Sequence, residues 1–201
     1  MLRSIARKLL RKNTLAAVPQ LLMWFPDTNS IPDNNLPEGY KHRSFLAGDE
    51  EGWCDLLNAN GQLGVWNRSR IDEERAGALV EDGQHFVLSQ GEHFVACAGV
   101  YDRDRDEGAC WEIGWIAADP DHRGLGLGGC VLANTLRFTR KLKKRPVYLF
   151  TDDFRMAAIK TYLKLGFVPD LSHSSYEGRW RKVLAALGPS YAKYVSLIKK
   201  E

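Results

Sequence analysis

The chain has 201 residues, of which 44% are hydrophobic and 26% are charged, a composition typical of a folded globular protein. No stretch approaches the roughly 18 apolar residues that span a bilayer, so we expect no stable membrane insertion. Residues 1–26 carry five of the 28 basic residues and no acidic residue, which leaves 23 basic and 25 acidic residues in the rest. That near balance argues against a basic nucleic-acid-binding surface, and no nucleic-acid partner is expected.

The first 37 residues have the character of an extension. Apolar and basic residues alternate at helical spacing near the start, and the apolar positions are Leu2, Ile5, Leu9 and Leu10. Such a basic amphipathic helix could pack on a domain, touch a membrane surface or act in targeting. Residues 26–38 hold three prolines, which indicates a linker. We therefore expect an N-terminal basic amphipathic extension with a Pro-rich linker (1–37) and a folded domain (38–201).

Hydrophobic periodicity and turn signals predict a mixed α+β order beyond the linker. Strands are expected at residues 40–45, 85–89, 94–101, 110–117 and 146–151, with a charged loop at 102–108. Helices are expected from residue 49 and at 70–79, 126–143, 156–165 and 176–187. The three middle strands follow one another without helices, so they are expected to be antiparallel. The segment 126–143 then makes a strand–helix–strand crossover.

The four cysteines are Cys54, Cys97, Cys110 and Cys130. None forms a Cys-x-x-Cys pair, and no histidine stands at metal-ligand spacing from one of them. We interpret them as reduced thiols in a reducing compartment, and we expect a cytoplasmic protein without a metal.

A glycine-rich turn joins the strand at 110–117 to the following helix. It reads Arg123-Gly124-Leu125-Gly126-Leu127-Gly128, with Gly129 next. Glycines let backbone N–H groups approach a ligand closely, and a helix N-terminus carries partial positive charge. The turn therefore predicts an anion site, typically for phosphate.

The turn fits the dinucleotide pattern Gly-x-Gly-x-x-Gly at Gly124, Gly126 and Gly129, and Asp152 follows the next strand where a ribose-binding acid would stand. Three observations argue against that interpretation. Pro120 and its neighbours separate the strand from the first glycine. Fewer than 80 residues follow the turn, and the upstream strands lack the helices of a dinucleotide fold.

The same turn also contains Arg-x-x-Gly-x-Gly, at Arg123, Gly126 and Gly128, which resembles the acetyl-CoA loop of the GNAT superfamily of N-acetyltransferases. A second segment, Ala158–Phe167, resembles that superfamily's later Ala-Ile-x-x-Tyr-x-x-x-Gly-Phe helix and follows at the right distance. The resemblance covers about residues 38–168. It implies the GNAT acyl-CoA N-acyltransferase fold, a central, mostly antiparallel twisted sheet with helices on both faces.

Two departures from the superfamily pattern stand out. Arg155 occupies a position where the family often has an asparagine that contacts the cofactor. The family fold usually ends in further strands, whereas residues 176–187 have a helical pattern.

The resemblance also implies the chemistry, namely direct acetyl transfer from acetyl-CoA to an amine in a ternary complex. It makes Tyr162 the general acid for the thiolate and Glu112 the general base acting through water. Asp152 and Asp153, at the end of the strand at 146–151, are reserve candidates for the base, and Asp152 could equally cap the following helix. Glu112 alternates with Gly114 and Ile116, so these residues are expected to share one face. The expected acetyl-CoA contacts are Ile116, Ala117 and Ala118, through their backbone, and Arg123, Gly124, Leu125, Gly126, Leu127, Gly128 and Gly129.

Two alternatives stay open beside the acetyltransferase. One is a non-catalytic acyl-CoA-binding or sensory module, and the other is a dinucleotide-binding oxidoreductase. The acceptor is expected to be a small-molecule or protein amine. The oligomeric state is left open, with a homodimer as one option.

Overall fold

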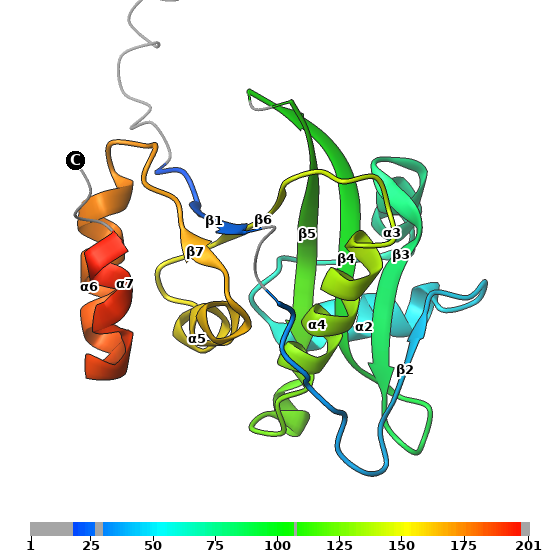
Figure 1. Cartoon of the computed structure of the whole chain (residues 1–201). Coiled ribbons are helices and arrows are strands. Elements are labelled where there is room, and N and C mark those ends of the chain that lie inside the picture. The colour runs from blue at the N-terminus through cyan, green and yellow to red at the C-terminus, as the bar shows by residue number, and fades with distance from the viewer. Residues whose placement is uncertain (1–17, 27–29, 107, 198–201) are drawn as a thin grey trace, which may run out of the picture.

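The computed structural model describes residues 18–26, 30–106 and 108–197, so the amphipathic helix expected near the N-terminus lies outside the described residues. The described part contains one seven-stranded sheet in the order β2-β3-β4-β5-β6-β1-β7 (Figure 1). The strands are β1 (Leu21–Phe25), β2 (Lys41–Ser44), β3 (Leu79–Leu88), β4 (Phe94–Arg105), β5 (Gly108–Ala118), β6 (Val147–Thr151) and β7 (Val168–Pro169). All neighbouring strands pair antiparallel except β5 and β6, which confirms the expected mixed fold.

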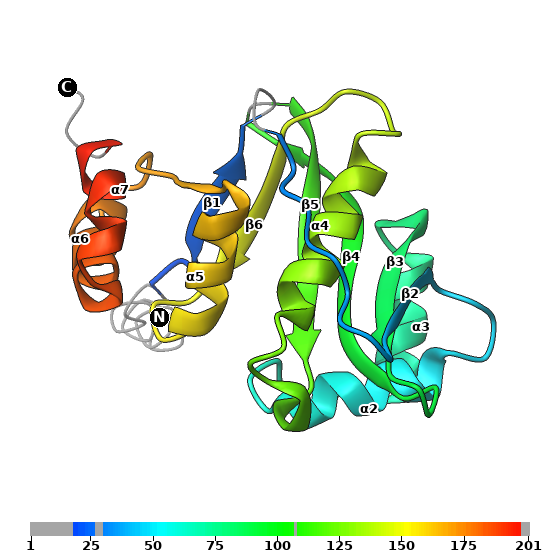
Figure 2. The same ribbon diagram turned by 60° about the horizontal axis from the view of Figure 1, so that its bottom comes forward.

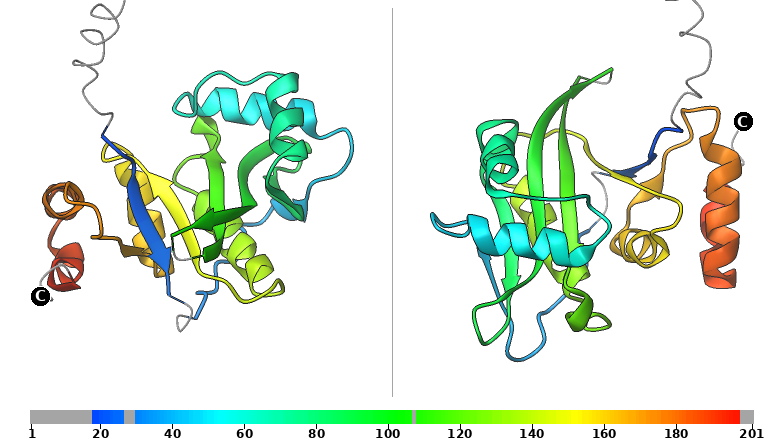
Figure 3. Two further views of the ribbon diagram at one scale, coloured as in Figure 1. Left: turned by 90° about the horizontal axis from the view of Figure 1, so that it is seen from above. Right: turned by 180° about the vertical axis from the view of Figure 1, so that it is seen from behind.

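Helices lie on both faces of the sheet. The helices are α2 (Glu50–Asn60), α3 (Arg68–Ala76), α4 (Leu127–Thr139), α5 (Met156–Leu165), α6 (Tyr176–Leu187) and α7 (Ala192–Leu197). Helices α4 and α5 lie on one side, and α2 and α3 lie behind β3–β5 on the other (Figures 2 and 3). Two hydrophobic clusters result, a large one that includes α4, α5 and α6 and a smaller one under α2 and α3.

Strand β1 corrects the expected boundary of the folded domain. The sequence pattern places residues 21–25 in the extension, yet they pair with β6 along its whole length, from Leu21 opposite Thr151 to Phe25 opposite Val147, and also with β7. The segment Leu-Leu-Met-Trp-Phe is continuously apolar, which suits a strand between two others. The chain beyond β7 is helical, as expected, so an N-terminal strand completes this end of the sheet.

Strands β5 and β6 separate soon after they meet. Their pairing covers only Trp111 with Val147 and Glu112 with Tyr148 among the described residues. Further along β5, Trp115 has a left-handed φ of 48°, and the β4–β5 register shifts nearby, which together mark a β-bulge. The edge of β5 that faces β6 is therefore open from residue 113 to residue 118.

The bulge makes one sequence expectation wrong. Before it, Trp111 and Ile113 belong to the large cluster, whereas after it Ile116 packs against that cluster and Ala117 belongs to the smaller one. The inserted residue reverses the alternation of side chains. Glu112 and Ile116 therefore lie on opposite faces of the sheet, whereas the sequence pattern places them on one face.

The charged segment 102–108 also differs from the expected loop. It forms the end of a long hairpin, in which β4 continues to Arg105 and pairs with Gly108 at the start of β5. Asp102 and Asp104 are exposed, whereas Arg103 and Arg105 are half-buried. The alternation of acidic and basic residues is thus the pattern of a strand that has one solvent-exposed face.

Candidate active site

The glycine turn adopts the backbone that its glycines allow. Gly124 and Gly126 have φ values of 83° and 75°, in the left-handed region that other residues avoid. The turn begins where Asp119 accepts a hydrogen bond from the N–H of Asp121 (2.8 Å), and Gly126 caps α4. Within the described chain, no backbone carbonyl accepts a hydrogen bond from the N–H groups of residues 124–128. These donors are therefore available to an anion.

A cavity of about 710 Å³ lies between the turn, the open edge of β5 and the N-terminal half of α5. Most residues expected to contact acetyl-CoA line it: Ile116, Ala117, Ala118, Arg123, Gly124, Gly126, Leu127, Gly128 and Gly129. Two expected site residues do not line it. Leu125 lies at the exposed tip of the turn, and Glu112 precedes the bulge on the other face. The folded chain thus brings the turn, the β5 edge and Tyr162 into one space.

The sequence interpretation missed two cationic residues of this cavity, Lys160 and Lys164. Lys160 and Lys164 on α5 join Arg123 and Arg155 in the lining, and no acidic side chain lines it. The two lysines stand four residues apart and so lie on one helix face. That spacing beside Tyr162 was the signal available in the sequence. Four cations and open N–H groups suit a ligand with several phosphates.

The end of β5 is fixed from the other side by the loop after α2. Asn60 donates a side-chain hydrogen bond of 3.1 Å to the carbonyl oxygen of Ala118, and Gln62 lines the same cavity. Neither residue was expected at the site. They come from the end of α2 and the loop that follows it, which has no local motif.

Tyr162 lies on α5 and is 3% exposed, with its ring against Phe167. Burial raises the pKa of Tyr162 to about 12, and the charges of Arg155 and Asp152 act in opposite directions on it. The phenol therefore keeps its proton at neutral pH. It is chemically able to donate that proton to an anion that forms beside it.

Glu112 lies in a polar cluster on the opposite face of β5. Its carboxylate accepts hydrogen bonds from Arg103 (2.9 Å) and from the hydroxyl of Tyr148 (3.3 Å). Gly114 next to it makes room for the ring of Tyr101, because a Cβ at residue 114 would lie 3.2 Å from that ring. Of the reserve acids, Asp153 pairs with Arg179 and its pKa is lowered mainly by that hydrogen bond, so its carboxylate is a poor proton acceptor.

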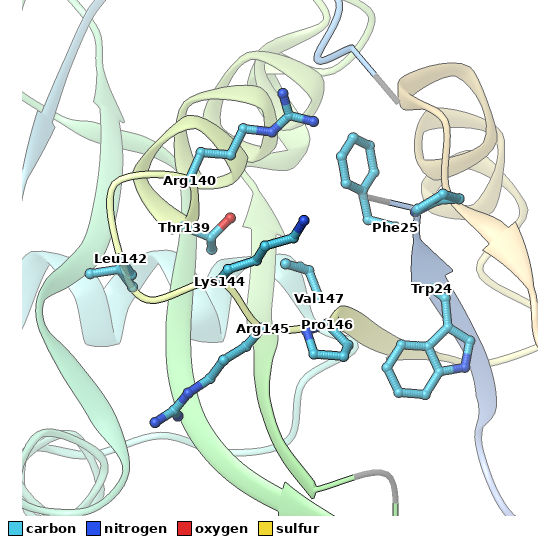
Figure 4. A pocket seen from close by; sticks show the side chains of 10 residues that line it. Trp24, Phe25, Thr139, Arg140, Leu142, Lys144, Arg145, Pro146 and Val147 are labelled. Carbon is cyan, nitrogen blue, oxygen red and sulfur yellow. The ribbon is translucent and has the colours of Figure 1, made fainter. Parts of the chain in front are cut away.

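Figure 4 shows a second cavity, of about 830 Å³, near the C-terminal end of α4 and the start of β6. Arg140, Lys144 and Arg145 line it together with Trp24 and Phe25. None of the residues expected at the active site lines it. Its three cations would repel an ammonium group, so we do not assign it to an amine acceptor.

The described residues contain no group of three or more histidine, cysteine, aspartate or glutamate side chains placed to hold a metal ion. No described helix is both long enough and apolar enough to cross a bilayer. All four cysteines are free thiols, and burial raises the pKa of Cys97 to about 12. Cys97 is therefore a buried thiol rather than a nucleophile.

A sheet split at a bulged strand, with an anion-binding glycine turn at the split, is characteristic of the GNAT fold class. The model of the acetyltransferase (GNAT) family matches residues 50–167, more than half of the chain, and the chain belongs to this family. A solved GCN5-related N-acetyltransferase from Sphaerobacter thermophilus superposes with a TM-score of 0.60 at 18% identity, covering 84% of this chain and 53% of that one. Glucosamine-6-phosphate N-acetyltransferase from Arabidopsis thaliana superposes with a TM-score of 0.53 at 18% identity, covering 69% and 97%.

Among curated proteins, the chain is similar to mycothiol acetyltransferases. It is 29% identical to that of Thermobispora bispora over 151 residues, which cover 71% of this chain and 51% of the relative. It is 30% identical to that of Salinispora arenicola over 168 residues, which cover 76% and 52%. The chain thus spans about half the length of the curated relatives it matches.

Proposed function

We propose that the protein is an acetyl-CoA-dependent N-acetyltransferase that moves acetyl to an amine by direct transfer in a ternary complex. One observation carries the proposal. The glycine turn, the unpaired edge of β5 and Tyr162 line a single cavity whose charged side chains are all cationic. Such a cavity suits a long ligand with phosphates at one end and a reactive carbonyl at the other.

In the proposed arrangement, N–H groups of residues 124–128 bind the pyrophosphate, and Arg123, Lys160 and Lys164 add positive charge. The backbone of Ile116–Ala118 pairs with the pantetheine arm as an added strand, which its open edge supports. An N–H group of this segment polarises the thioester carbonyl.

The amine nitrogen then attacks the thioester carbon, the new C–N bond forms and the C–S bond breaks. Tyr162 donates its proton to the departing thiolate. Glu112, through a water molecule, removes the proton that the amine must lose. Because Glu112 lies on the face opposite Ile116, the amine is placed to approach through the split from the Glu112 side.

The acceptor is proposed to be a small-molecule amine, with a protein amine as the second candidate. The relatives named mycothiol acetyltransferase support the small-molecule class. The four free thiols support a reducing, cytoplasmic location.

The test is thiol release from acetyl-CoA by the purified protein across a panel of small amines and lysine-containing peptides. We expect release that depends on both the amine and the acetyl-CoA concentration. Tight acetyl-CoA binding with no release by any amine would instead support the non-catalytic acyl-CoA-binding module.

A further inference from the structure

The bulge in β5 places an aromatic residue in a backbone conformation that aromatic residues avoid. Trp115 has a φ of 48°, and among the described residues other than glycine only Asp82 and Glu92 share a positive φ. Left-handed backbone brings Cβ too close to the following carbonyl oxygen, so it costs free energy for a bulky residue. Such strain persists only where the surrounding structure enforces it, and it gathers at functional sites. The contacts of Trp115 therefore identify what holds the bulge.

The ring of Trp115 belongs to a stack of three side chains. It packs edge-on against the ring of Trp66, with the centroids 4.6 Å apart. The guanidinium carbon of Arg70 lies 3.8 Å from the centroid of Trp66 and 5.2 Å from that of Trp115, which suits cation–π attraction. Arg70 also donates a hydrogen bond of 2.8 Å to the carbonyl oxygen of Val65. We call Trp66, Arg70 and Trp115 the bulge brace.

The bulge brace is anchored to α2 through Trp66. The backbone N–H of Trp66 donates to the side-chain oxygen of Asn58 (2.8 Å), and its carbonyl accepts a bond from the Asn58 amide (3.0 Å). The indole N–H of Trp66 donates to the carbonyl of Leu63 at 2.9 Å, and the side chain is 3% exposed. Trp66 is thus a fixed surface against which the ring of Trp115 rests.

A hydrogen bond from β4 sets the direction of the next peptide group. The buried thiol of Cys97 donates to the carbonyl oxygen of Trp115 at 3.3 Å. The peptide group between Trp115 and Ile116 is trans, so its N–H points opposite to its carbonyl. The N–H of Ile116 is therefore directed away from Cys97 and β4, toward the side on which the edge of β5 is open. Ile116 lines the proposed acetyl-CoA cavity.

We propose that the bulge brace is a positioning device. It holds residue 115 in the left-handed conformation and thereby aims the N–H of Ile116 at the thioester carbonyl of the bound ligand. Trp66 and Arg70 do not line the cavity, so they act through Trp115 and are positioning residues. This inference rests on the proposed function, and it makes catalysis depend on α3 and on the loop before it.

The experiment uses the different backbone preferences of alanine and glycine at residue 115. Trp115→Ala removes the ring but keeps the Cβ that disfavours left-handed backbone, whereas Trp115→Gly removes both. We expect kcat, measured by thiol release with the best amine of the panel, to fall at least about tenfold in Trp115→Ala. In Trp115→Gly it should be at least about fivefold higher than in Trp115→Ala. The Kd of free CoA, which lacks the thioester carbonyl, should change less than about twofold in both variants.

Arg70→Gln tests the other end of the bulge brace, and Arg75→Gln is its matched control. Arg75 lies on the same helix, and its guanidinium carbon is 4.3 Å from the ring of Phe45, which is not part of the brace. It also pairs with Glu50 at 2.6 Å. We expect kcat to fall at least about threefold in Arg70→Gln and less than about twofold in Arg75→Gln.

The outcomes separate the inference from the proposed function. If Trp115→Gly is no more active than Trp115→Ala, the ring acts by packing alone, because glycine leaves the same space and adds chain flexibility. That result overturns the inference, as does an unchanged kcat in Trp115→Ala or an equal loss in the two arginine variants. Absence of thiol release by the wild type with every amine would instead defeat the proposed function. Thermal unfolding tests the brace without turnover: Trp115→Gly should unfold at a higher temperature than Trp115→Ala, and the reverse order would contradict the brace.

Discussion

Arg155 reaches across the cavity to Gln62, donating a hydrogen bond of 2.6 Å to its backbone carbonyl, while it pairs with Asp152 at 3.2 Å. It thereby joins the start of α5 to the loop after α2, at a position where the family often has asparagine. We expect Arg155→Asn to weaken acetyl-CoA binding about three- to tenfold, because it removes one cation from the lining. Arg155→Lys keeps the charge and should retain most of the affinity. Tighter binding by Arg155→Asn would show that the arginine closes the cavity against the ligand instead.

Gly126 allows the charge and the backbone of the turn to be tested separately. Its φ is 75°, and nothing lies within 4 Å of the position that a Cβ would take, so steric clash is not an obstacle to a side chain. Asparagine and aspartate both tolerate left-handed backbone and have nearly the same size. We expect Gly126→Asp to bind acetyl-CoA at least about tenfold more weakly than Gly126→Asn, because a carboxylate would repel the pyrophosphate. Equal affinities in a calorimetric titration would remove the turn from the phosphate site.

Tyr162→Phe tests the proposed acid. The change removes only the hydroxyl, so the buried ring still packs against Phe167 and acetyl-CoA affinity should change less than about twofold. We expect kcat to fall about 10²-fold, since the thiolate loses its proton donor. Tyr194→Phe is the control, because its hydroxyl donates to the carbonyl of Leu163 on the same helix as Tyr162 and does not line the cavity. An unchanged kcat in Tyr162→Phe would mean that the thiolate leaves without this acid.

Glu112→Gln tests the proposed base. The amide cannot accept the amine's proton, so kcat/KM should fall about 10²-fold and the low-pH limb of the rate profile should flatten. Arg103→Gln removes the partner of the carboxylate and leaves the carboxylate itself. We expect Arg103→Gln to lower kcat/KM much less than Glu112→Gln does. If the two variants lose activity equally and keep the wild-type pH profile, Glu112 supports the structure rather than the proton transfer.

The pair formed by buried His85 and half-buried His42 predicts that acid destabilises the fold. His85 is 5% exposed and its ring nitrogen lies 3.1 Å from that of His42; burial lowers the pKa of His85 from 6.5 to about 4. His85 is therefore protonated below about pH 6.5 in the unfolded chain, but only below about pH 4 in the folded chain. The free energy of unfolding should fall as the pH drops across that window, by up to about 3 kcal/mol. Urea unfolding should show that this fall in the free energy of unfolding is smaller for His85→Asn than for the wild type. His93→Asn, at an exposed position, should show the same fall as the wild type.

The sequence predicts the parts of the fold that have local causes. Helix α5 begins at Met156 and ends before Gly166 as expected, because its apolar spacing and its left-handed glycine are both local signals. The turn with Gly124 and Gly126 is recognisable for the same reason.

The features that escape the sequence pattern depend on partners distant in the chain. Nothing near residues 21–25 indicates that Leu21 pairs with Thr151, so the pattern alone places β1 in an extension. The bulge at Trp115 has no local signature, and it reverses the face on which Glu112 lies relative to Ile116. The motif also does not explain why residue 129 is a glycine. In the structure, a Cβ at this position would lie 2.6 Å from the Asn34 side chain, so a larger residue would clash with it.

We propose above that the cavity between β5 and α5 binds acetyl-CoA. The most direct test is calorimetric titration of the purified chain with acetyl-CoA and, separately, with NAD. We predict saturable binding of one acetyl-CoA per chain, weakened by added salt because phosphates meet Arg123, Lys160 and Lys164, and no binding of NAD. Binding of NAD without binding of acetyl-CoA would contradict it.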